Sequence, residues 1–384
     1  MNTAKFTPTR TGNLVPIMTP GGPDNAFIPN DLPPNWELPP TLVQKLIDAR
    51  TALALLDGIG RTLPDPELLL VPLKKREAIT SSRIEGTYAT AQELMLFEMG
   101  SFDSKSKNDE LNSWREVHNY SEALSQGVKL LENMPFCGRV IKDLHKLLML
   151  GVRGQHSVPG QWRDYQVAIG SDRRYVPPPP NVMVERINNL EKYINEESSL
   201  DPLVRAYLVH YQFEAIHPFA DGNGRIGRVL LSLMVAAWCN LSCPWLYMSS
   251  FFEKFKDEYV ENLFKISAEG AWDKWIEFCL NGTIHQATDA IARCEKLRAL
   301  KQDMLKRVRP GSPRSEQIID GLFSNPIVRI SHLRRTLNVS YPTAQCDVDR
   351  LVKVSILETL NVRPKCYYSS EIFRIAYAEQ TNGL

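Results

Sequence analysis

The sequence predicts a mainly α-helical protein that carries a small β-hairpin and ends in a winged helix-turn-helix domain. Apolar residues recur every three or four positions through most of the 384 residues, which is the period of an α-helix. One passage, residues 160–178, instead alternates apolar and polar side chains. The final stretch, residues 314–384, has the pattern helix, short helix, turn, helix and two short strands, which is typical of a winged helix.

Composition limits the classes of function. The net charge is +1, so no overall charge favours wrapping nucleic acid or lying on a membrane. The seven cysteines form no CxxC pair, which predicts a reduced chain without a disulfide framework or a zinc site. The apolar run "VLLSLMVAAWC" is shorter than the roughly 20 residues that span a bilayer, and the N-terminus has no apolar signal region. A cytoplasmic protein without membrane segments is expected.

Five segments follow one another along the chain. Residues 1–40 hold nine of the 26 prolines, and because proline removes N–H donors they predict an extended arm. Residues 41–135 predict an N-terminal helical region, and residues 136–300 predict a helical core. Residues 301–313 end in Pro-Gly-Ser-Pro and predict a linker, which leads into the winged helix-turn-helix at 314–384.

The hairpin prediction depends on the passage "GQWRDYQVAIGSDRRYVPPPP". Tyr165, Val167 and Ile169 alternate with other residues, and the chain turns near Gly170. These features predict two short strands within residues 160–178. Two interpretations of the arginines here stay open, added positive potential for phosphates or plain solvated charges; they are Arg163, Arg173 and Arg174.

The loop "HPFADGNGRIGR", from His217 to Arg228, has more polar residues than a turn requires. The preceding helix must end near His217, because a residue before proline is pushed out of the α region. The following helix is apolar almost all round, so its N-terminus, with free amides and a positive dipole end, points at the loop and favours an anion. Arg225 and Arg228 share one face of its first turn.

The same loop offers groups for chemistry on a phosphate. Asp221 is a hard oxygen ligand of the kind that binds Mg²⁺ beside phosphate oxygens. His217 is the side chain suited to accept a proton at neutral pH. The alternative is a helical hairpin whose Asp-Gly-Asn-Gly is an ordinary turn, but the histidine and both arginines together favour a polyphosphate site. Neither a P-loop nor a zinc-protease motif is present.

The loop resembles the signature HxFx(D/E)GNGRxxR of the Fic (filamentation induced by cAMP) family at every fixed position. The resemblance implies a Fic-type helical core with the hairpin as a flap, and a protein adenylyltransferase that moves AMP from ATP to a Ser, Thr or Tyr hydroxyl and releases pyrophosphate. His217 would be the general base and Asp221 the Mg²⁺ ligand. The implied ATP- and phosphate-binding residues are Phe219, Ala220, Asp221, Gly222, Asn223, Gly224, Arg225 and Arg228, with Val167 and Gly170 of the flap and Tyr259 near adenine.

The stretch "SSRIEGT" resembles the inhibitory motif of the same family at Ser81, Glu85 and Gly86. The resemblance implies that Glu85 pairs with Arg228 and blocks the productive position of the γ-phosphate. The alternatives are a solvated glutamate and a glutamate that orients a water for removal of AMP. At the adenine position, Tyr259 matches the family but Val260 replaces its second tyrosine, so the adenine contacts stay open.

The implied partners are ATP and a target protein that docks on residues 160–178. Self-modification and a homodimer stay open. The segment 314–384 has nine basic and seven acidic residues, and its recognition helix carries Asp347 and Asp349, so dimerisation or target docking is favoured over DNA binding. Two alternative functions remain: a de-AMPylating hydrolase, and a nucleotide-sensing transcription regulator that binds DNA through the winged helix.

Overall fold

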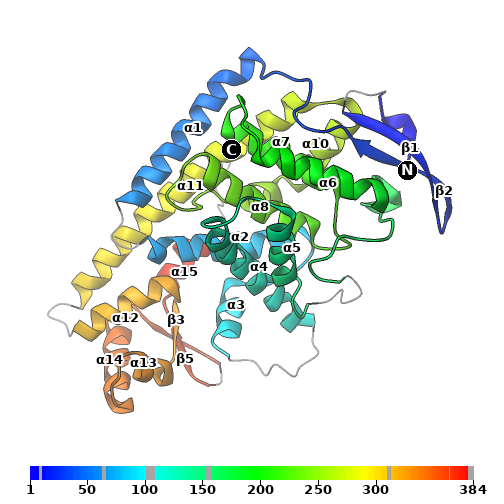
Figure 1. Cartoon of the computed structure of the whole chain (residues 1–384). Helices are drawn as coiled ribbons and strands as arrows, with labels where there is room; N and C mark the ends of the chain where they lie inside the picture. Colours follow the sequence, from blue (N-terminus) through cyan, green and yellow to red (C-terminus); the bar gives the residue numbers. More distant parts are fainter. Residues whose placement is uncertain are drawn as a thin grey trace.

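The computed structural model describes residues 1–7, 11–62, 66–100, 109–152, 158–308, 313–362 and 364–378. Most of these residues lie in α-helices, and the β-structure is limited to two small antiparallel sheets (Figure 1). The mainly α-helical prediction is confirmed. Among the described residues, no helix is long and apolar enough to cross a membrane.

The proline-rich N-terminus, expected as an extended arm, contains a β-hairpin. β1 (Gly12–Thr19) pairs antiparallel with β2 (Gly22–Pro29), and Gly22 takes a positive φ of 106° at the turn. A two-stranded ribbon has two edges, so prolines that lack an N–H can face outward without breaking the ladder. The hairpin docks on the helical body through Phe27, whose N–H donates to the Val176 carbonyl and whose side chain is buried.

Four helices form the N-terminal helical region: α1 (Pro40–Arg61), α2 (Glu67–Ile84), α3 (Ala91–Glu98) and α4 (Asp109–Leu131). α1 packs along the long helix α11 (Trp272–Arg307) at one side of the molecule (Figure 1). α2 ends at Ile84, since Gly86 follows in the left-handed region with φ 85°, a conformation that stops a helix.

The central body consists of α5 (Gly138–Leu148), α6 (Pro180–Asn195), α7 (Pro202–Ile216), α8 (Asn223–Trp238), α9 (Ser249–Lys254), α10 (Lys256–Glu269) and α11. α8 is apolar on nearly every face, and it packs against α2, α4, α5 and α7 (Figure 1). Burial of this helix fixes the direction of its N-terminus, and therefore the position of the loop at 217–222.

The segment 160–178 contains less β-structure than its alternation predicts. A single bridge joins Ile169 to Tyr175, and the turn between them is the short 3₁₀-helix η2 (Ser171–Arg173). Consecutive prolines at the end of the segment offer no N–H donors for a longer ladder. Side chains replace those bonds: the Gln166 amide donates to the Pro177 carbonyl at 2.9 Å.

The C-terminal region contains α12 (Pro313–Ser324), β3 (Ile327–Val328), α13 (Ile330–Thr336), α14 (Tyr341–Lys353), β4 (Glu358–Leu360), β5 (Cys366–Tyr368) and α15 (Ser370–Tyr377). Its three strands form an antiparallel sheet in the order β3-β5-β4. The winged helix-turn-helix remains a prediction for this region. The segment expected as a linker at 301–313 begins inside α11, and residues 309–312 lie outside the described chain.

The C-terminal region packs on the helical body. Arg293 of α11 donates to the carbonyls of Ile375 and Ala378, and Arg329 donates to the carbonyl of Met99 beyond α3. Asp347, one of the two acids of the presumed recognition helix α14, is buried and paired with Arg314 at 2.7 Å.

Candidate active site

His217 closes α7 in a left-handed conformation, with φ 52° and ψ 61°. Its N–H donates to the Phe213 carbonyl at 2.9 Å, and its ring Nδ1 lies 3.3 Å from the Glu214 carbonyl. A carbonyl only accepts, so Nδ1 carries the proton and Nε2 is left as the acceptor. Burial, followed by the charge of Arg163, lowers the pKa of His217 to about 4, so the ring is neutral at pH 7.

Arg163 braces the backbone around His217. Its Nε donates to the His217 carbonyl at 2.8 Å, and its terminal nitrogens donate to the carbonyls of Tyr165 and Pro178. The side chain is buried, so Arg163 is not a solvated charge, and a contribution of positive potential for phosphates stays a prediction. Arg173 and Arg174, the other two arginines of this segment, pair with Asp24 and Glu261.

Gly222 and Asn223 connect the loop to α8. Gly222 precedes the helix in a left-handed conformation with φ 76°. The buried Asn223 side chain accepts from the Phe219 N–H and donates to the Phe219 carbonyl, both at 2.8 Å. Asn223 therefore fixes the loop's curvature with its side chain, and only its backbone N–H is left to join the predicted anion site.

His145 of α5 is a loop-supporting residue that the sequence did not single out. Its Nδ1 accepts from the Gly160 N–H at 2.9 Å, so Nε2 carries the proton and donates to the Asp221 carbonyl at 2.9 Å. The ring stacks on Phe219 with centroids 3.6 Å apart. Burial lowers the pKa of His145 to about 4, which keeps this donor and acceptor arrangement at neutral pH.

The exposed Asp221 lies beside the buried Arg225 at the start of α8. The Asp221 side chain is 54% exposed, its Oδ1 accepts from the Gly222 N–H, and it lies 3.7 Å from Arg225 Nη2. Arg225 Nη1 binds Glu116 Oε2 of α4 at 3.0 Å, and Thr87 donates to the same Glu116 oxygen at 2.6 Å. Glu116 was not identified from the sequence, because nothing in its neighbourhood marks it.

Arg228 is held by the end of α2. Its Nε donates to Ser81 Oγ at 2.8 Å, and its Nη2 contacts Glu85 Oε1 at 2.7 Å. Burial alone would raise the pKa of Glu85, but the charge and hydrogen bond of Arg228 outweigh it and lower that pKa. A Cβ on Gly224 would lie 2.3 Å from Glu85 Oε1, so the glycine permits this close approach.

A second carboxyl, Glu214 of α7, lies behind this ion pair. Its Oε1 is buried without a hydrogen-bond partner among the described residues. Burial raises the pKa of Glu214 to about 8, although Arg228 opposes the rise. Glu214 is therefore mostly protonated at neutral pH, and Glu85 is the ionised partner of Arg228.

The remaining predicted residues lie at different depths. Val167 is half-buried and Gly170 is exposed, with φ 78° at the turn of the 160–178 segment. Tyr259 is 3% exposed, its hydroxyl donates to His210 Nε2 at 2.8 Å, and its ring stacks on Phe252 at 4.3 Å. The structure thus places Tyr259 in the core behind Arg228. Ala220 is half-buried beside Phe219, which is fully buried.

The possible metal ligands near the loop are few. Within the described part of the chain, no group of three or more His, Cys, Asp or Glu side chains is arranged to hold one. A single exposed carboxylate is nevertheless what Mg²⁺ uses when phosphate oxygens and water supply the other ligands. Asp221 fits that description, because its side chain is exposed next to the N-terminus of α8.

Two family models match consecutive regions of the chain. Residues 43–129 match the Fic/DOC family N-terminal domain, and residues 135–235 match the Fic/DOC family. Protein adenylyltransferase fic-1 of Caenorhabditis elegans is 40% identical over 78 residues, which cover 20% of this chain and 15% of that protein. A probable protein adenylyltransferase of Aquifex aeolicus is 35% identical over 79 residues, which cover 21% of this chain and 24% of that protein. The aligned segments thus span a quarter or less of these relatives' lengths.

Solved structures show the same fold. A Fic family protein from Desulfovibrio desulfuricans G20 superposes with a TM-score of 0.57 at 19% identity, covering 88% of this chain and 98% of that chain. Fic-1 of Caenorhabditis elegans superposes with a TM-score of 0.53 at 21% identity, covering 66% of this chain and 75% of that chain.

Proposed function

Because this chain belongs to the Fic/DOC family, we propose that it is a protein adenylyltransferase that moves AMP from ATP to a hydroxyl group of a target protein. One observation carries the proposal: the loop presents a neutral histidine, an exposed carboxylate and an amide-rich helix N-terminus side by side. Phosphoryl-type transfer depends mainly on such positioning and charge neutralisation.

In the proposed reaction the target's hydroxyl oxygen attacks the α-phosphorus of ATP. A new oxygen–phosphorus bond forms, the bond between the α-phosphorus and the oxygen leading to the β-phosphate breaks, and pyrophosphate leaves with the bond electrons. His217 accepts the hydroxyl proton at Nε2, since Nδ1 is held by the Glu214 carbonyl.

The backbone amides of Gly222, Asn223 and Gly224 serve the phosphates in this proposal, assisted by the positive end of the α8 dipole. Arg225 contacts the β-phosphate and Arg228 the γ-phosphate. Asp221 would hold Mg²⁺, and the ion would supply charge neutralisation for the phosphates. Residues 160–178 receive the target as an extended segment, with Val167 and Gly170 bordering the nucleotide.

In this proposal the conformation with Glu85 on Arg228 is the inhibited form of the enzyme. Arg228 cannot bind a γ-phosphate while Glu85 occupies its Nη2. Ser81 holds the Nε of the same guanidinium, so α2 covers the phosphate end of the site with two side chains. Relief of the inhibition requires Glu85 to move away from Arg228. The Glu85 side chain is 38% exposed, so solvent already reaches it.

A de-AMPylating hydrolase is the second candidate, and one observation favours it. Glu85 lies close enough to His217 for its charge to raise the histidine pKa against the effect of burial. A carboxylate so near the base is placed to orient a water molecule toward a bound AMP ester. Loss of Glu85 then abolishes hydrolysis, whereas it activates transfer.

The test incubates wild type, Glu85→Gly, His217→Ala and the double variant Glu85→Gly/His217→Ala with Mg²⁺ and ATP labelled on the α-phosphate, in the presence of cell extract. Label on protein with Glu85→Gly, and at least a hundredfold less with Glu85→Gly/His217→Ala, is the expected result. Absence of label in every form contradicts the transferase. Release of AMP from a labelled protein by wild type, lost in Glu85→Gly, supports the hydrolase.

A further inference from the structure

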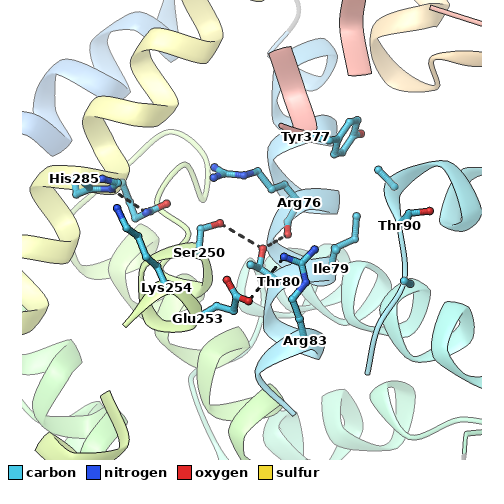
Figure 2. A pocket seen from close by; sticks show the side chains of 13 residues that line it. Arg76, Ile79, Thr80, Arg83, Thr90, Ser250, Glu253, Lys254, His285 and Tyr377 are labelled. Carbon is cyan, nitrogen blue, oxygen red and sulfur yellow. Dashed lines mark hydrogen bonds and ion pairs between the residues drawn. The ribbon is translucent and has the colours of Figure 1, made fainter. Parts of the chain in front are cut away.

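A separate cavity of about 380 Å³ lies on the far side of α2 from Arg228. It is lined by residues from α2, the segment 89–91, α9, α11 and α15, and none of them belongs to the loop at 217–228. Figure 2 shows Arg76, Thr80 and Arg83 along α2, opposite Ser250, Glu253 and Lys254 of α9. The volume is in the range of about 300–1,000 Å³ that is usual for small-molecule sites.

The lining is rich in positive charge. Arg76, Arg83 and Lys254 line the cavity, and Glu253 is the one acid among the described lining residues. Arg83 Nη1 lies 3.8 Å from Glu253 Oε1, which is a long ion pair (Figure 2). His285 adds no positive charge of its own, because burial and then the charge of Lys254 lower its pKa. The field in the cavity therefore favours an anion.

Arg76 adds to the excess of positive charge in the cavity. It shares the carboxylate of Asp289 with Arg293, so two guanidinium groups are neutralised by one acid. The rest of the wall contains the apolar side chains of Ile79, Ala89 and Ala91 and the ring of Tyr377, together with the hydroxyls of Thr80 and Ser250, which lie 3.4 Å apart. A charged group with an apolar body fits such a mixed wall.

The cavity and the active-site ion pair lie on different sides of one helix. Arg76, Thr80 and Arg83, spaced by four and three residues, form the cavity face of α2, whereas Ser81 and Glu85 hold Arg228. Arg83 lies in the last turn of α2, two residues before Glu85. A group that joins Arg83 to α9 and α11 therefore restrains the turn that carries Glu85.

We propose that this cavity binds a small organic anion, such as a phosphate monoester with an apolar body, and that the bound anion holds Glu85 on Arg228. The cavity is formed while the Glu85–Arg228 pair is intact, so a ligand that prefers this form stabilises it. The regulatory consequence, inhibition of AMP transfer, rests on the proposed function; the binding itself does not.

Binding is tested by calorimetric titration of the full chain with 1-naphthyl phosphate, with neutral 1-naphthol and inorganic phosphate as partial probes. We expect one site per chain, binding at least tenfold weaker in Lys254→Ala and in Arg83→Gln, and about threefold tighter in Glu253→Gln. Lys254 is exposed, so its loss leaves the fold intact. Lys274→Ala, an exposed lysine of α11 outside the cavity, is the matched control and binds as wild type.

Hydrogen–deuterium exchange locates the site and tests the coupling without any activity assay. We expect 1-naphthyl phosphate to slow exchange at residues 79–87 and 250–254, but not at 217–228. Wild-type affinity in both Lys254→Ala and Arg83→Gln, or protection confined to 217–228, overturns the site. Binding without slower exchange at 81–87 overturns the coupling. A failed labelling assay leaves these measurements in place, so it contradicts the proposed function alone.

Discussion

The loop at residues 217–224 and the end of α2 at residues 81–87 meet at the N-terminus of α8, but different contacts hold them there. The loop is fixed by side chains that bond its backbone: Arg163 to His217, His145 to Asp221, and Asn223 to Phe219. At the end of α2, Ser81 and Glu85 bind Arg228, and Glu85 supplies a carboxylate. Lys256 also donates to the Ile84 carbonyl there.

The two sets of contacts differ in whether a bound nucleotide would displace them. The contacts to loop backbone do not use the groups proposed for the nucleotide, so nucleotide binding does not require them to break. The contacts of Arg228 occupy the group proposed for the γ-phosphate, so they must break before ATP binds productively. Substitutions in the first region therefore lose activity, and substitutions in the second gain it.

The largest effect is expected for Asn223→Ala. Both backbone groups of buried Phe219 lose their partner, which lowers the free energy of unfolding by about 2–4 kcal/mol. In the Glu85→Gly background we expect at least a hundredfold less labelling of target, measured on protein shown to be folded by circular dichroism. Asn281→Ala, an exposed asparagine of α11, is the control. Labelling within threefold of the background would show that the loop does not need this brace.

The opposite sign is expected for Glu85→Gly, with at least a tenfold gain in labelling. Arg228 is 2% exposed and loses its carboxylate partner while it keeps its Ser81 contacts, so the free energy of unfolding falls by about 1–3 kcal/mol. Glu85→Gln separates charge from shape: its amide oxygen still accepts from Arg228, so its gain is smaller. Equal labelling by wild type and Glu85→Gly would remove the distinction between the two regions.

Glu116→Gln tests a residue of α4 that contacts both the first turn of α8 and the end of α2. Glu116 binds Arg225 on one side and Thr87 on the other, and Arg225 Nη2 still lies toward Asp221. This geometry makes Glu116 a positioning residue for the guanidinium. We expect about fivefold less labelling in the Glu85→Gly background, mainly as a higher KM for ATP. Glu122→Gln, an exposed acid of the same helix, serves as the control, and a gain of activity would make Glu116 a second inhibitory contact instead.

Sequence reasoning identified the mainly helical fold and the loop between α7 and α8, because period and turn chemistry are local signals. The closeness of Glu85 and Arg228 came from resemblance to a known motif, since 143 positions separate the two residues. His145, Arg163 and Glu116 were missed or misjudged for one reason. Their partners are backbone atoms or side chains far away along the chain, and neither leaves a pattern in the sequence.

The β-structure was predicted less well, again for physical reasons. Prolines suggested an extended arm and gave no sign of a hairpin, but a two-stranded ribbon tolerates them at its edges, and β1 and β2 pair along their length. In residues 160–178 the alternation suggested a ladder, but prolines removed its donors and Arg163 and Gln166 supplied bonds instead. Both errors arise from tertiary contacts that override a local preference.

The smallest effect is expected for Glu214→Gln, and it depends on pH. The pKa of Glu214 is about 8 in the folded protein, against 4.5 for a free side chain. The folded state therefore holds a proton that the unfolded state releases, and stability falls as pH rises between these values. Glutamine has no such penalty, so relative to wild type its melting temperature rises by about 3–6 °C between pH 5 and pH 8.5. Glu185→Gln, an exposed acid of α6, shows no such rise. A pH-independent difference would mean that Glu214 is ionised in the fold, and Arg228 would then be paired with two carboxylates rather than with Glu85 alone.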